Sequence, residues 1–369
     1  MKTAIITTTI NIPYLLKDYT DNAKKFNHKD IFFVITGDKK SHPDTRDFCD
    51  NLAKESGYEI TFLNVSDQEK FLEPYTELKD FLPYNCIQRR NVSFLYAYEK
   101  KAEIIITIDD DNFITENSDF IGEHSIVGTN KEIEALSSSS GWINVCDFLE
   151  EKNNHPFYHR GFPLEKRWID QTIDIKNKKG RIVVNAGFWL QDPDIDAITR
   201  LTLPIKSTGF KKKNNFVIDI GTWTPFNSQN TSVLREVIQS YFMSPFIGRY
   251  DDIWPSYLVK KIADHLGDFI SFGFPLVKQD RNEQDIIVNL ENEIWGMRLT
   301  NRFCNILKEI KLSENDYLSC SKEIYKKLKQ YQEQKNIFNE KENKFFNKFL
   351  EGINVWNKTI DRANKKYIT

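Results

Sequence analysis

Two alternating periods of apolar and polar positions run along the first third of the chain. Short apolar runs rich in β-branched and aromatic residues predict strands at residues 4–9, 30–36, 59–65 and 104–108. The segments between them carry apolar residues at helical spacing, which predicts helices at residues 13–26, 44–55 and 88–101. Strands that alternate with helices in this way are typical of a Rossmann-like α/β fold with a mainly parallel sheet.

The fourth apolar run stops abruptly at three carboxylates, Asp109, Asp110 and Asp111. A strand this rich in isoleucine is expected to be buried on both faces, and ligands of such sheets bind beyond the carboxyl ends of the strands. Asp109 and Asp111 are therefore predicted metal ligands, because hard cations prefer carboxylate oxygens. Aspartates after a strand also occur in solvated turns and as helix caps, so the cluster alone leaves both interpretations open.

Polar residues after the other strands are expected at the same edge, where a nucleotide would lie. Thr8 follows the first strand and Asp38 follows the second. Arg89, Arg90 and Asn91 open the helix before the acidic strand, a place suited to holding a diphosphate or a base. The alternative is an exposed pair of arginines on a helix face.

The pattern changes after the acidic cluster and again near the end of the chain. Residues 116–147 show few periodic apolar positions, which predicts a loop that serves as an active-site lid or as a surface connection. Residues 308–366 are rich in Lys and Glu, with aromatic residues spaced by three and four. This spacing predicts helices that pack one apolar stripe onto the catalytic domain or another subunit, with a membrane-surface or partner-binding helix as the alternative.

Composition excludes several functional classes. The 369 residues carry a formal net charge of −2, so no overall basic field favours nucleic acid as a partner. The five cysteines lack the spacing of a zinc site or a disulfide framework. The N-terminus lacks a signal-peptide pattern, and no apolar stretch reaches membrane-spanning length. We therefore expect a soluble cytoplasmic protein without a membrane span.

Three further motifs follow the acidic cluster in a fixed order. They are RGFPLEKR at residues 160–167, GFWLQDPDIDAIT at residues 187–199 and GRYDDIW at residues 248–254. Together they resemble the reversibly glycosylated polypeptide family, which includes the plant UDP-arabinopyranose mutases and is classed with the GT-A glycosyltransferases. The resemblance covers roughly residues 104–296. It implies a GT-A-like fold with a mixed, mainly parallel sheet: a catalytic domain at residues 1–300 and a helical extension at residues 301–369.

The resemblance assigns roles to residues at matching positions. Asp109, Asp110 and Asp111 correspond to the residues that hold Mn²⁺ or Mg²⁺ and the diphosphate of a UDP-sugar. Arg160 corresponds to the self-glycosylated arginine, and Arg167 to a second arginine needed for activity. A charged arginine is a poor nucleophile, so both arginines also suit neutralisation of the leaving diphosphate. A structural salt bridge is the remaining alternative for each.

Asp251 and Asp252 lie where GT-A enzymes place an acidic residue that contacts the sugar or the acceptor. A carboxylate there can act as a general base, although both residues also precede a predicted helix and Asp is a favoured N-cap. Trp189 and Trp254 are predicted either as sugar-stacking surfaces or as core residues.

The chain departs from the family in two places. Relatives carry a histidine about eight residues before a Val-Asn-Leu segment, whereas this chain has Asp280 there, a predicted substitute metal ligand. Residues 216–227 also differ from the plant pattern and are predicted to line the sugar or acceptor pocket.

The sequence therefore predicts a UDP-sugar-dependent and metal-dependent enzyme that breaks and re-forms the sugar–UDP bond. The alternatives are a glycosyltransferase that uses a separate glycan acceptor and a non-catalytic nucleotide-sugar-binding subunit. The partners left open are a glycan acceptor and, through the C-terminal helices, a second copy of the chain in a homo-oligomer.

Overall fold

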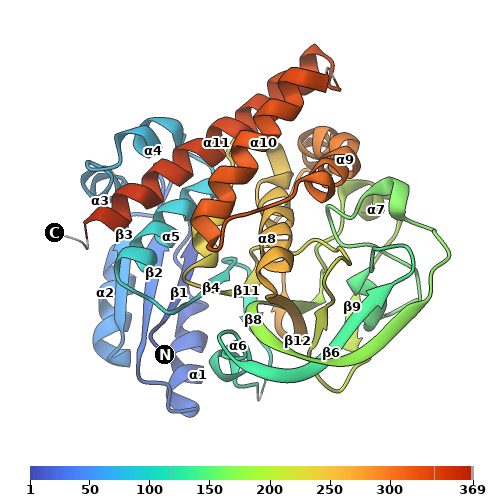
Figure 1. Cartoon of the computed structure of the whole chain (residues 1–369). Helices are drawn as coiled ribbons and strands as arrows, with labels where there is room; N and C mark the ends of the chain where they lie inside the picture. Colours follow the sequence, from blue (N-terminus) through green and yellow to red (C-terminus); the bar gives the residue numbers. More distant parts are fainter. Residues whose placement is uncertain (117, 336, 367–369) are drawn as a thin grey trace.

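The N-terminal half of the fold is a parallel sheet covered by helices. The computed structural model describes residues 1–116, 118–335 and 337–366 (Figure 1). The first four strands are parallel and lie in the order β3 (Glu59–Leu63), β2 (Ile31–Thr36), β1 (Thr3–Thr8) and β4 (Ile104–Ile108). The helices of this half are α1 (Leu16–Lys25), α2 (Thr45–Ser56), α3 (Val65–Phe71), α4 (Thr76–Phe81) and α5 (Arg90–Glu99). The four predicted strands and three predicted helices are thus confirmed.

Antiparallel strands continue the sheet beyond β4. Strand β11 (Asn230–Leu234) runs antiparallel to both β4 and β8 (Ile173–Gln191). The remaining strands are β6 (Asn130–Ser138), β10 (Phe216–Ile218), β12 (Phe269–Gln279), β5 (Asn112–Ile114), β7 (Leu149–Glu151) and β9 (Ser207–Phe210). A parallel half-sheet that bears the acidic cluster and continues into antiparallel strands confirms the predicted GT-A-like α/β class.

The loop prediction for residues 116–147 is wrong over most of this segment. It contains α6 (Phe120–His124) and the nine-residue strand β6, which pairs antiparallel with residues 173–181 of β8. Ile133, Ala135 and Leu136 are the buried apolar positions of β6, and its other residues are polar. A strand with so few apolar positions has a weak local signal, because its order depends on a partner some forty residues away.

The C-terminal helices pack onto the sheet domain, as predicted. They are α7 (Ala197–Thr202), α8 (Ile253–Leu266), α9 (Ile286–Glu309), α10 (Tyr317–Lys335) and α11 (Glu340–Lys365). Trp254 of α8 stacks on Phe303 of α9 with ring centroids 4.4 Å apart, and Phe349 of α11 meets the same indole. The proposed boundary between residues 300 and 301 falls within α9, and the division into two units stays a prediction. In the described part of the chain, no helix has both the length and the hydrophobicity to cross a bilayer.

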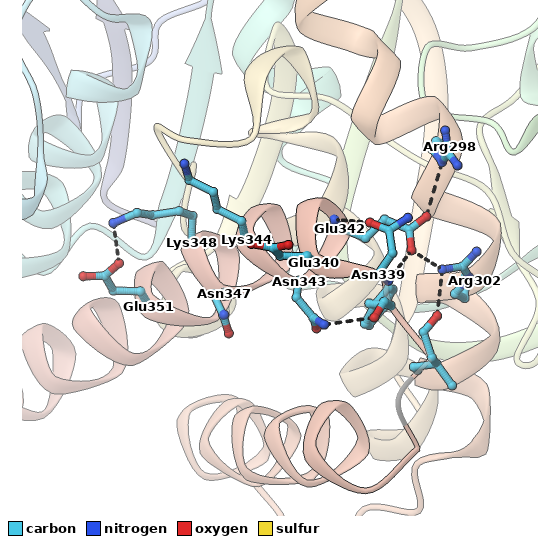
Figure 2. Close-up of a pocket in the computed structure, with 12 residues that line it drawn as sticks. Arg298, Arg302, Asn339, Glu340, Glu342, Asn343, Lys344, Asn347, Lys348 and Glu351 are labelled. Atoms are coloured by element: carbon cyan, nitrogen blue, oxygen red, sulfur yellow. Dashed lines mark hydrogen bonds and ion pairs between the residues drawn. The ribbon is translucent and has the colours of Figure 1, made fainter.

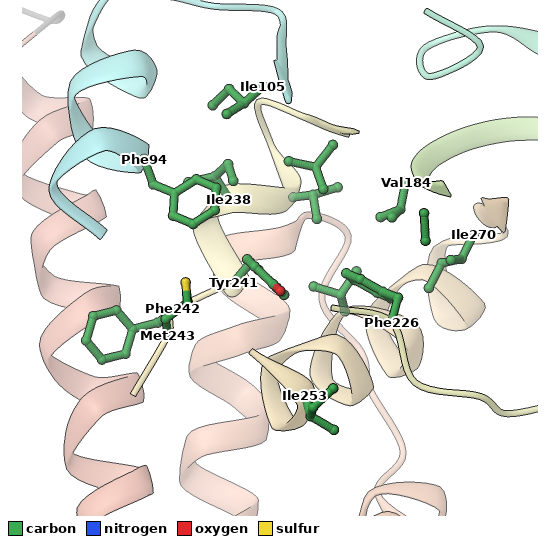
Figure 3. Packing of buried hydrophobic residues seen from close by; sticks show 14 of the residues in the cluster. Phe94, Ile105, Val184, Phe226, Ile238, Tyr241, Phe242, Met243, Ile253 and Ile270 are labelled. Atoms are coloured by element: carbon green, nitrogen blue, oxygen red, sulfur yellow. The ribbon is translucent and has the colours of Figure 1, made fainter. Parts of the chain in front are cut away.

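Buried aromatic and aliphatic side chains pack together around Tyr241 (Figure 3). Tyr241 packs edge-on against Phe94 of α5, with centroids 5.8 Å apart, and stacks on Phe226 at 5.7 Å. Its hydroxyl donates a hydrogen bond to the backbone oxygen of Asp252 at 3.2 Å. The core therefore directly fixes the backbone that carries a predicted catalytic carboxylate.

Trp356 provides a test of how strongly α11 is attached. Its side chain is 1% exposed, stacks on Phe242 and donates to the Ile238 oxygen at 2.7 Å. We expect Trp356→Ala to lower the free energy of unfolding by about 3–5 kcal/mol, since it leaves a cavity and an unpaired carbonyl. Urea unfolding measures this, with the 71% exposed Trp168→Ala as control, expected within about 0.5 kcal/mol of wild type. Equal losses in the two variants would contradict this account of the packing.

Candidate active site

The predicted sheet edge opens into a polar cavity of about 510 Å³. Its walls come from the ends of strands β1, β4 and β12, the start of α5, the segment before β11 and the turn before α8. The charged and polar residues that line it include Thr8, Gln88, Arg90, Asp109, Asp110, Asp111, Arg160, Ser228, Gln229, Arg249, Asp251, Asp252, Gln279 and Arg281. Segments far apart in the sequence thus bring carboxylates and guanidiniums together.

The three aspartates after β4 have different partners. Asp109 forms an ion pair with Arg90 at 2.5 Å, and Asp110 accepts a hydrogen bond from the Thr9 hydroxyl at 2.6 Å. Asp111 accepts from the Gln279 amide at 3.3 Å. Burial, followed by the nearby charge of Asp109, raises the pKa of Asp111 to about 7. The cluster is therefore a partly buried group of neighbouring carboxylates rather than a solvated turn.

The donor set around this cluster suits a hard divalent cation. Asp109 and Asp111 offer carboxylate oxygens, and the Gln279 amide oxygen is buried without a hydrogen-bond partner. A positive ion would relieve the electrostatic cost that raises the pKa of Asp111. Within residues 1–116, 118–335 and 337–366, however, no three His, Cys, Asp or Glu side chains are already arranged to hold a metal. Two protein carboxylates would need oxygens from the substrate to complete the coordination shell.

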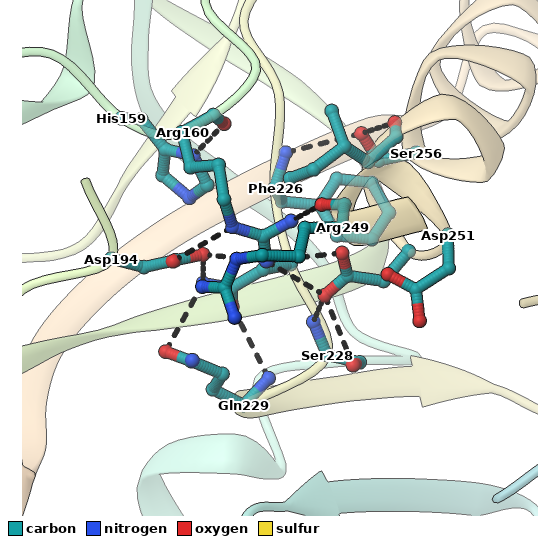
Figure 4. Close-up of polar contacts among 12 residues, drawn as sticks. His159, Arg160, Asp194, Phe226, Ser228, Gln229, Arg249, Asp251 and Ser256 are labelled. Atoms are coloured by element: carbon teal, nitrogen blue, oxygen red, sulfur yellow. Dashed lines mark hydrogen bonds and ion pairs between the residues drawn. The ribbon is translucent and has the colours of Figure 1, made fainter. Parts of the chain in front are cut away.

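Arg160 lies at the centre of a buried ionic cluster (Figure 4). Its Nε and Nη2 donate to the two carboxylate oxygens of Asp194, each at 2.9 Å, and Nη2 also reaches Asp252 at 3.1 Å. Nη1 donates to the backbone oxygen of Arg249. Burial opposes the charge, but Asp194 and Asp252 raise the pKa of Arg160 well above its usual value. In this arrangement Arg160 is a cation rather than a nucleophile.

Asp251 and Asp252 face the cavity from the turn before α8. Asp252 occupies the N-cap position of α8 without a side-chain capping bond, and instead accepts from Arg160 and from the Ser228 amide at 3.0 Å. Asp251 accepts from the Gln88 side chain at 2.7 Å. Burial and the charge of Asp252 raise the pKa of Asp251 to about 7. The capping alternative therefore does not account for either carboxylate.

The second arginine of the helix-opening segment, rather than the first, reaches the cavity. Arg90 donates to Asp109 and to the Ser228 oxygen and hydroxyl, both at 3.0 Å, and contacts Thr8 at 3.4 Å. Arg89 is buried and donates to Gln68, while Asn91 bonds to the backbone of Gln88 and Met243. Neither lines the cavity. Of the two arginines in this segment, only Arg90 lines the cavity, and its part in holding a diphosphate stays a prediction.

Several other predicted site residues lie outside the cavity wall. Asp38 accepts from the Cys86 amide, and Arg167 pairs at 2.6 Å with Asp196, the N-cap of α7. Trp189 packs in the core against His159, and Asp280 is exposed at the end of β12. These placements favour supporting roles for the first three residues. The functions of all of them stay predictions.

The structure decides between the two alternatives for Trp254 and corrects the prediction for residues 216–227. Trp254 is 0% exposed and stacks on Phe303, so it belongs to the core and offers no sugar-stacking surface. Residues 216–227 do not appear in the cavity wall, which starts at Ser228 in this part of the chain. Asn227 instead lies beneath it and donates to Asp194 at 2.7 Å. This segment therefore supports the ionic cluster.

The lining residues that the predicted site lacked include Ser228, Gln229, Gln279 and Arg281. They flank strands β11 and β12, which follow the acidic cluster by more than a hundred residues. The sequence could have indicated these residues only as polar positions at the ends of apolar strands. Local periodicity does not predict the order of strands in the sheet, which is what brings β11 and β12 to the cavity.

A larger groove of about 1120 Å³ lies along α9 and the start of α11 (Figure 2). Glu342 accepts from Arg302 at 3.0 Å and from Arg298 at 3.2 Å, and it also closes the N-terminal capping box of α11. The side chains of Arg298, Arg302 and Glu342 thus pair with one another across the junction between α9 and α11. The smaller cavity is the better candidate site, because it brings together the acidic cluster, Asp251 with its raised pKa and Arg281, whose nearest carboxylate among the described residues lies 3.9 Å away.

Comparison with known proteins identifies the family. The family described as reversibly glycosylated polypeptide matches residues 16–362. The chain belongs to the reversibly glycosylated polypeptide family. The predicted family is therefore confirmed over nearly the whole chain, further than the range on which the resemblance was first noted.

Named relatives within this family come from plants. UDP-arabinopyranose mutase 2 of Arabidopsis thaliana is 26% identical over 326 residues, which cover 84% of this chain and 80% of that protein. UDP-arabinopyranose mutase 3 of the same plant is 28% identical over 272 residues, which cover 69% of this chain but only 62% of the relative's length. The predicted class, a glycosyltransferase-like enzyme, agrees with these relatives.

Among solved structures, the chain is similar to glucosyl-3-phosphoglycerate synthase from Mycobacterium tuberculosis, in a complex with Mn²⁺, UDP-glucose and phosphoglyceric acid. The TM-score is 0.41 at 11% identity, and the match covers 82% of this chain and 80% of that one.

The raised pKa of Asp251 predicts a pH-dependent stability. An unfolded aspartate titrates near pH 4, so between about pH 4 and 7 the folded chain keeps a proton that the unfolded chain has released. This group therefore lowers the free energy of unfolding as the pH rises through that window. We expect Asp251→Asn to gain about 1–4 kcal/mol relative to wild type between pH 4.5 and 7.5, as measured by urea unfolding. Parallel pH profiles for the two proteins would contradict the assignment.

Proposed function

We propose that this chain is a UDP-sugar-dependent, metal-dependent enzyme that breaks and re-forms the bond between the sugar and UDP. The observation that carries the proposal is the cavity in which the acidic cluster after β4, the Arg160 cluster and Asp251 meet. Membership of the reversibly glycosylated polypeptide family supports a mutase, and the relatives' names make UDP-arabinopyranose the first substrate to test.

A change of ring form sets specific chemical demands. The bond between the anomeric carbon and the diphosphate oxygen breaks, and its electron pair leaves on UDP. A different sugar hydroxyl then forms a bond to the anomeric carbon and loses its proton, after which the bond from that carbon to the former ring oxygen breaks and this oxygen gains a proton. UDP finally re-forms the bond to the anomeric carbon. The site therefore needs positive charge for the diphosphate and one group that both accepts and donates a proton.

The acidic cluster and the arginines meet the first demand. Asp109 and Asp111 would hold Mn²⁺ or Mg²⁺, and the bound ion would neutralise charge that develops on the diphosphate. Arg90 holds Asp109 in place at 2.5 Å, so that carboxylate is oriented before substrate arrives. Arg160 contributes a fixed positive charge, since Asp194 and Asp252 keep it protonated.

Asp251 meets the second demand. It lines the cavity and is 5% exposed, and its pKa of about 7 lets it hold or release a proton near neutral pH. The Gln88 amide donates to one of its carboxylate oxygens and fixes the orientation of the group. We assign Asp251 the proton transfers between sugar hydroxyls. The same property suits a general base for a separate acceptor, which keeps a glycosyltransferase as the second candidate.

The proposal gives Arg160 an electrostatic role. Attack by its nitrogen on the anomeric carbon would require loss of a proton from a guanidinium that two buried carboxylates stabilise. Each of its three nitrogens also donates to a protein oxygen already. An adduct on Arg160 would therefore need the cluster to rearrange first.

The test is incubation of the purified protein with Mn²⁺ and a panel of UDP-sugars that includes UDP-arabinopyranose, followed by nucleotide-sugar chromatography and intact-protein mass. We expect a UDP-sugar isomer from wild type. Asp251→Asn should lower kcat by about 10²–10⁴-fold and keep UDP binding, as loss of a general acid–base does. Arg160→Lys should lower it by about 10²-fold or more, because one ammonium cannot reproduce the fork.

Arg298→Lys is the matched control, because Arg298 is 60% exposed and pairs with Glu342 in the groove, outside the cavity. It should keep wild-type turnover. Release of free UDP without an isomer would favour the glycosyltransferase, and failure to consume any UDP-sugar would refute the proposed donor. A sugar-sized mass gain abolished by Arg160→Lys would contradict the electrostatic role and place the sugar on that residue.

A further inference from the structure

Four arginines line the cavity, and three of them are closely paired. Arg90 meets Asp109 at 2.5 Å, Arg160 meets Asp194 at 2.9 Å, and Arg249 meets Glu293 at 2.8 Å. Each of these guanidiniums thus has a carboxylate within direct hydrogen-bond distance. Their positive charge is largely neutralised before any ligand binds.

Arg281 is the exception. Among the described residues, its nearest carboxylate is Asp194 at 3.9 Å, and Asp194 already receives two bonds from Arg160. The one hydrogen bond found for its side chain goes from Nη2 to the Pro193 oxygen at 3.3 Å. Its Nε is buried without a hydrogen-bond partner, and the side chain as a whole is only 9% exposed. A guanidinium has five N–H donors, so most of its capacity is unused.

The position of Arg281 places this charge beside the acidic cluster. Arg281 comes two residues after Gln279, whose side-chain amide donates to the Asp111 carboxylate. The backbone N–H of Asp280 donates to the backbone oxygen of Asp111 at 3.1 Å. The end of β12 is therefore tied to the turn that carries the predicted metal ligands. Arg281 lines the same cavity as Asp109 and Asp111.

We propose that Arg281 binds the diphosphate of the nucleotide sugar, next to the cation held by Asp109 and Asp111. The inference rests on the proposed function, which supplies the diphosphate. A planar fork with free donors matches two phosphate oxygens, and binding would satisfy donors that the protein leaves unpaired.

The local electrostatics agree with this role. The guanidiniums of Arg200 and Arg249 lie near Arg281, whereas its nearest carboxylate among the described residues is Asp194 at 3.9 Å. Neighbouring carboxylates therefore leave its charge undercompensated, and an anionic ligand would complete the balance.

Calorimetric titration with UDP and with uridine, in Mn²⁺ buffer and in EDTA, separates the phosphate contact from the rest of the site. We expect Arg281→Gln to weaken UDP binding by about 10-fold to 100-fold and leave uridine binding unchanged, because a lost hydrogen bond to a charged group has this size. Arg281→Lys should recover part of the loss. The control is Arg200→Gln, since Arg200 donates to the same Pro193 oxygen at 2.8 Å but does not line the cavity.

The outcomes separate the inference from the function on which it rests. Wild-type protein that does not bind UDP would overturn both. Wild-type protein that binds UDP, with Arg281→Gln binding it equally well, would overturn the role of Arg281 and leave the proposed function standing. Equal losses for UDP and uridine would also overturn it, because the change would then act on the shape of the pocket. Urea unfolding of the free variants checks that each is folded.

Discussion

The buried ion pairs of Arg160 are the interaction on which the site depends. Asp194 and Asp252 both bond to one guanidinium, and each carboxylate has further donors, from Asn227 and Ser228. Burying such charges is costly unless their hydrogen bonds are nearly complete, and removal of one partner leaves an uncompensated charge. The three sequence motifs each contribute one of these residues. The cluster therefore fixes the relative positions of three segments that are distant in the sequence.

This cluster also sets the chemistry of its neighbours. Asp252 is committed to Arg160 and Ser228, and its charge helps to raise the pKa of the adjacent Asp251. Asp252 is held by the Arg160 guanidinium, whereas burial and the charge of Asp252 raise the pKa of Asp251 to about 7, so the pair can provide an ion-paired carboxylate and a proton carrier. Arg90 and Arg281 both line the cavity with the acidic cluster, and Arg90 has a much closer carboxylate than Arg281 has. These differences are the basis for the proposed roles of Asp251 in proton transfer and of Arg281 in binding the diphosphate.

Local periodicity was sufficient to predict β1 to β4 and the acidic cluster, because a dense run such as Ile104–Ile108 carries its own signal. It failed where order depends on distant pairing, as for β6, whose polar sequence is ordered by β8. It also could not choose between Arg89 and Arg90, since a 3₁₀ turn at Ile87–Arg89 sets the phase of the helix that follows. Trp189 and Arg167 belong to real family motifs, yet their packing against His159 and Asp196 becomes evident only in the fold.

The central claim is that one cavity holds the diphosphate between the acidic cluster and the arginines while Arg160 stays a paired cation. A crystal structure of the full chain with UDP and Mn²⁺ tests it most directly. The account predicts the diphosphate and the ion beside Asp109 and Asp111, with Arg281 in contact with phosphate oxygens and Arg160 still bonded to Asp194. Nucleotide bound in the groove along α9 and α11, or Arg160 released from Asp194 and turned toward the ligand, would contradict it.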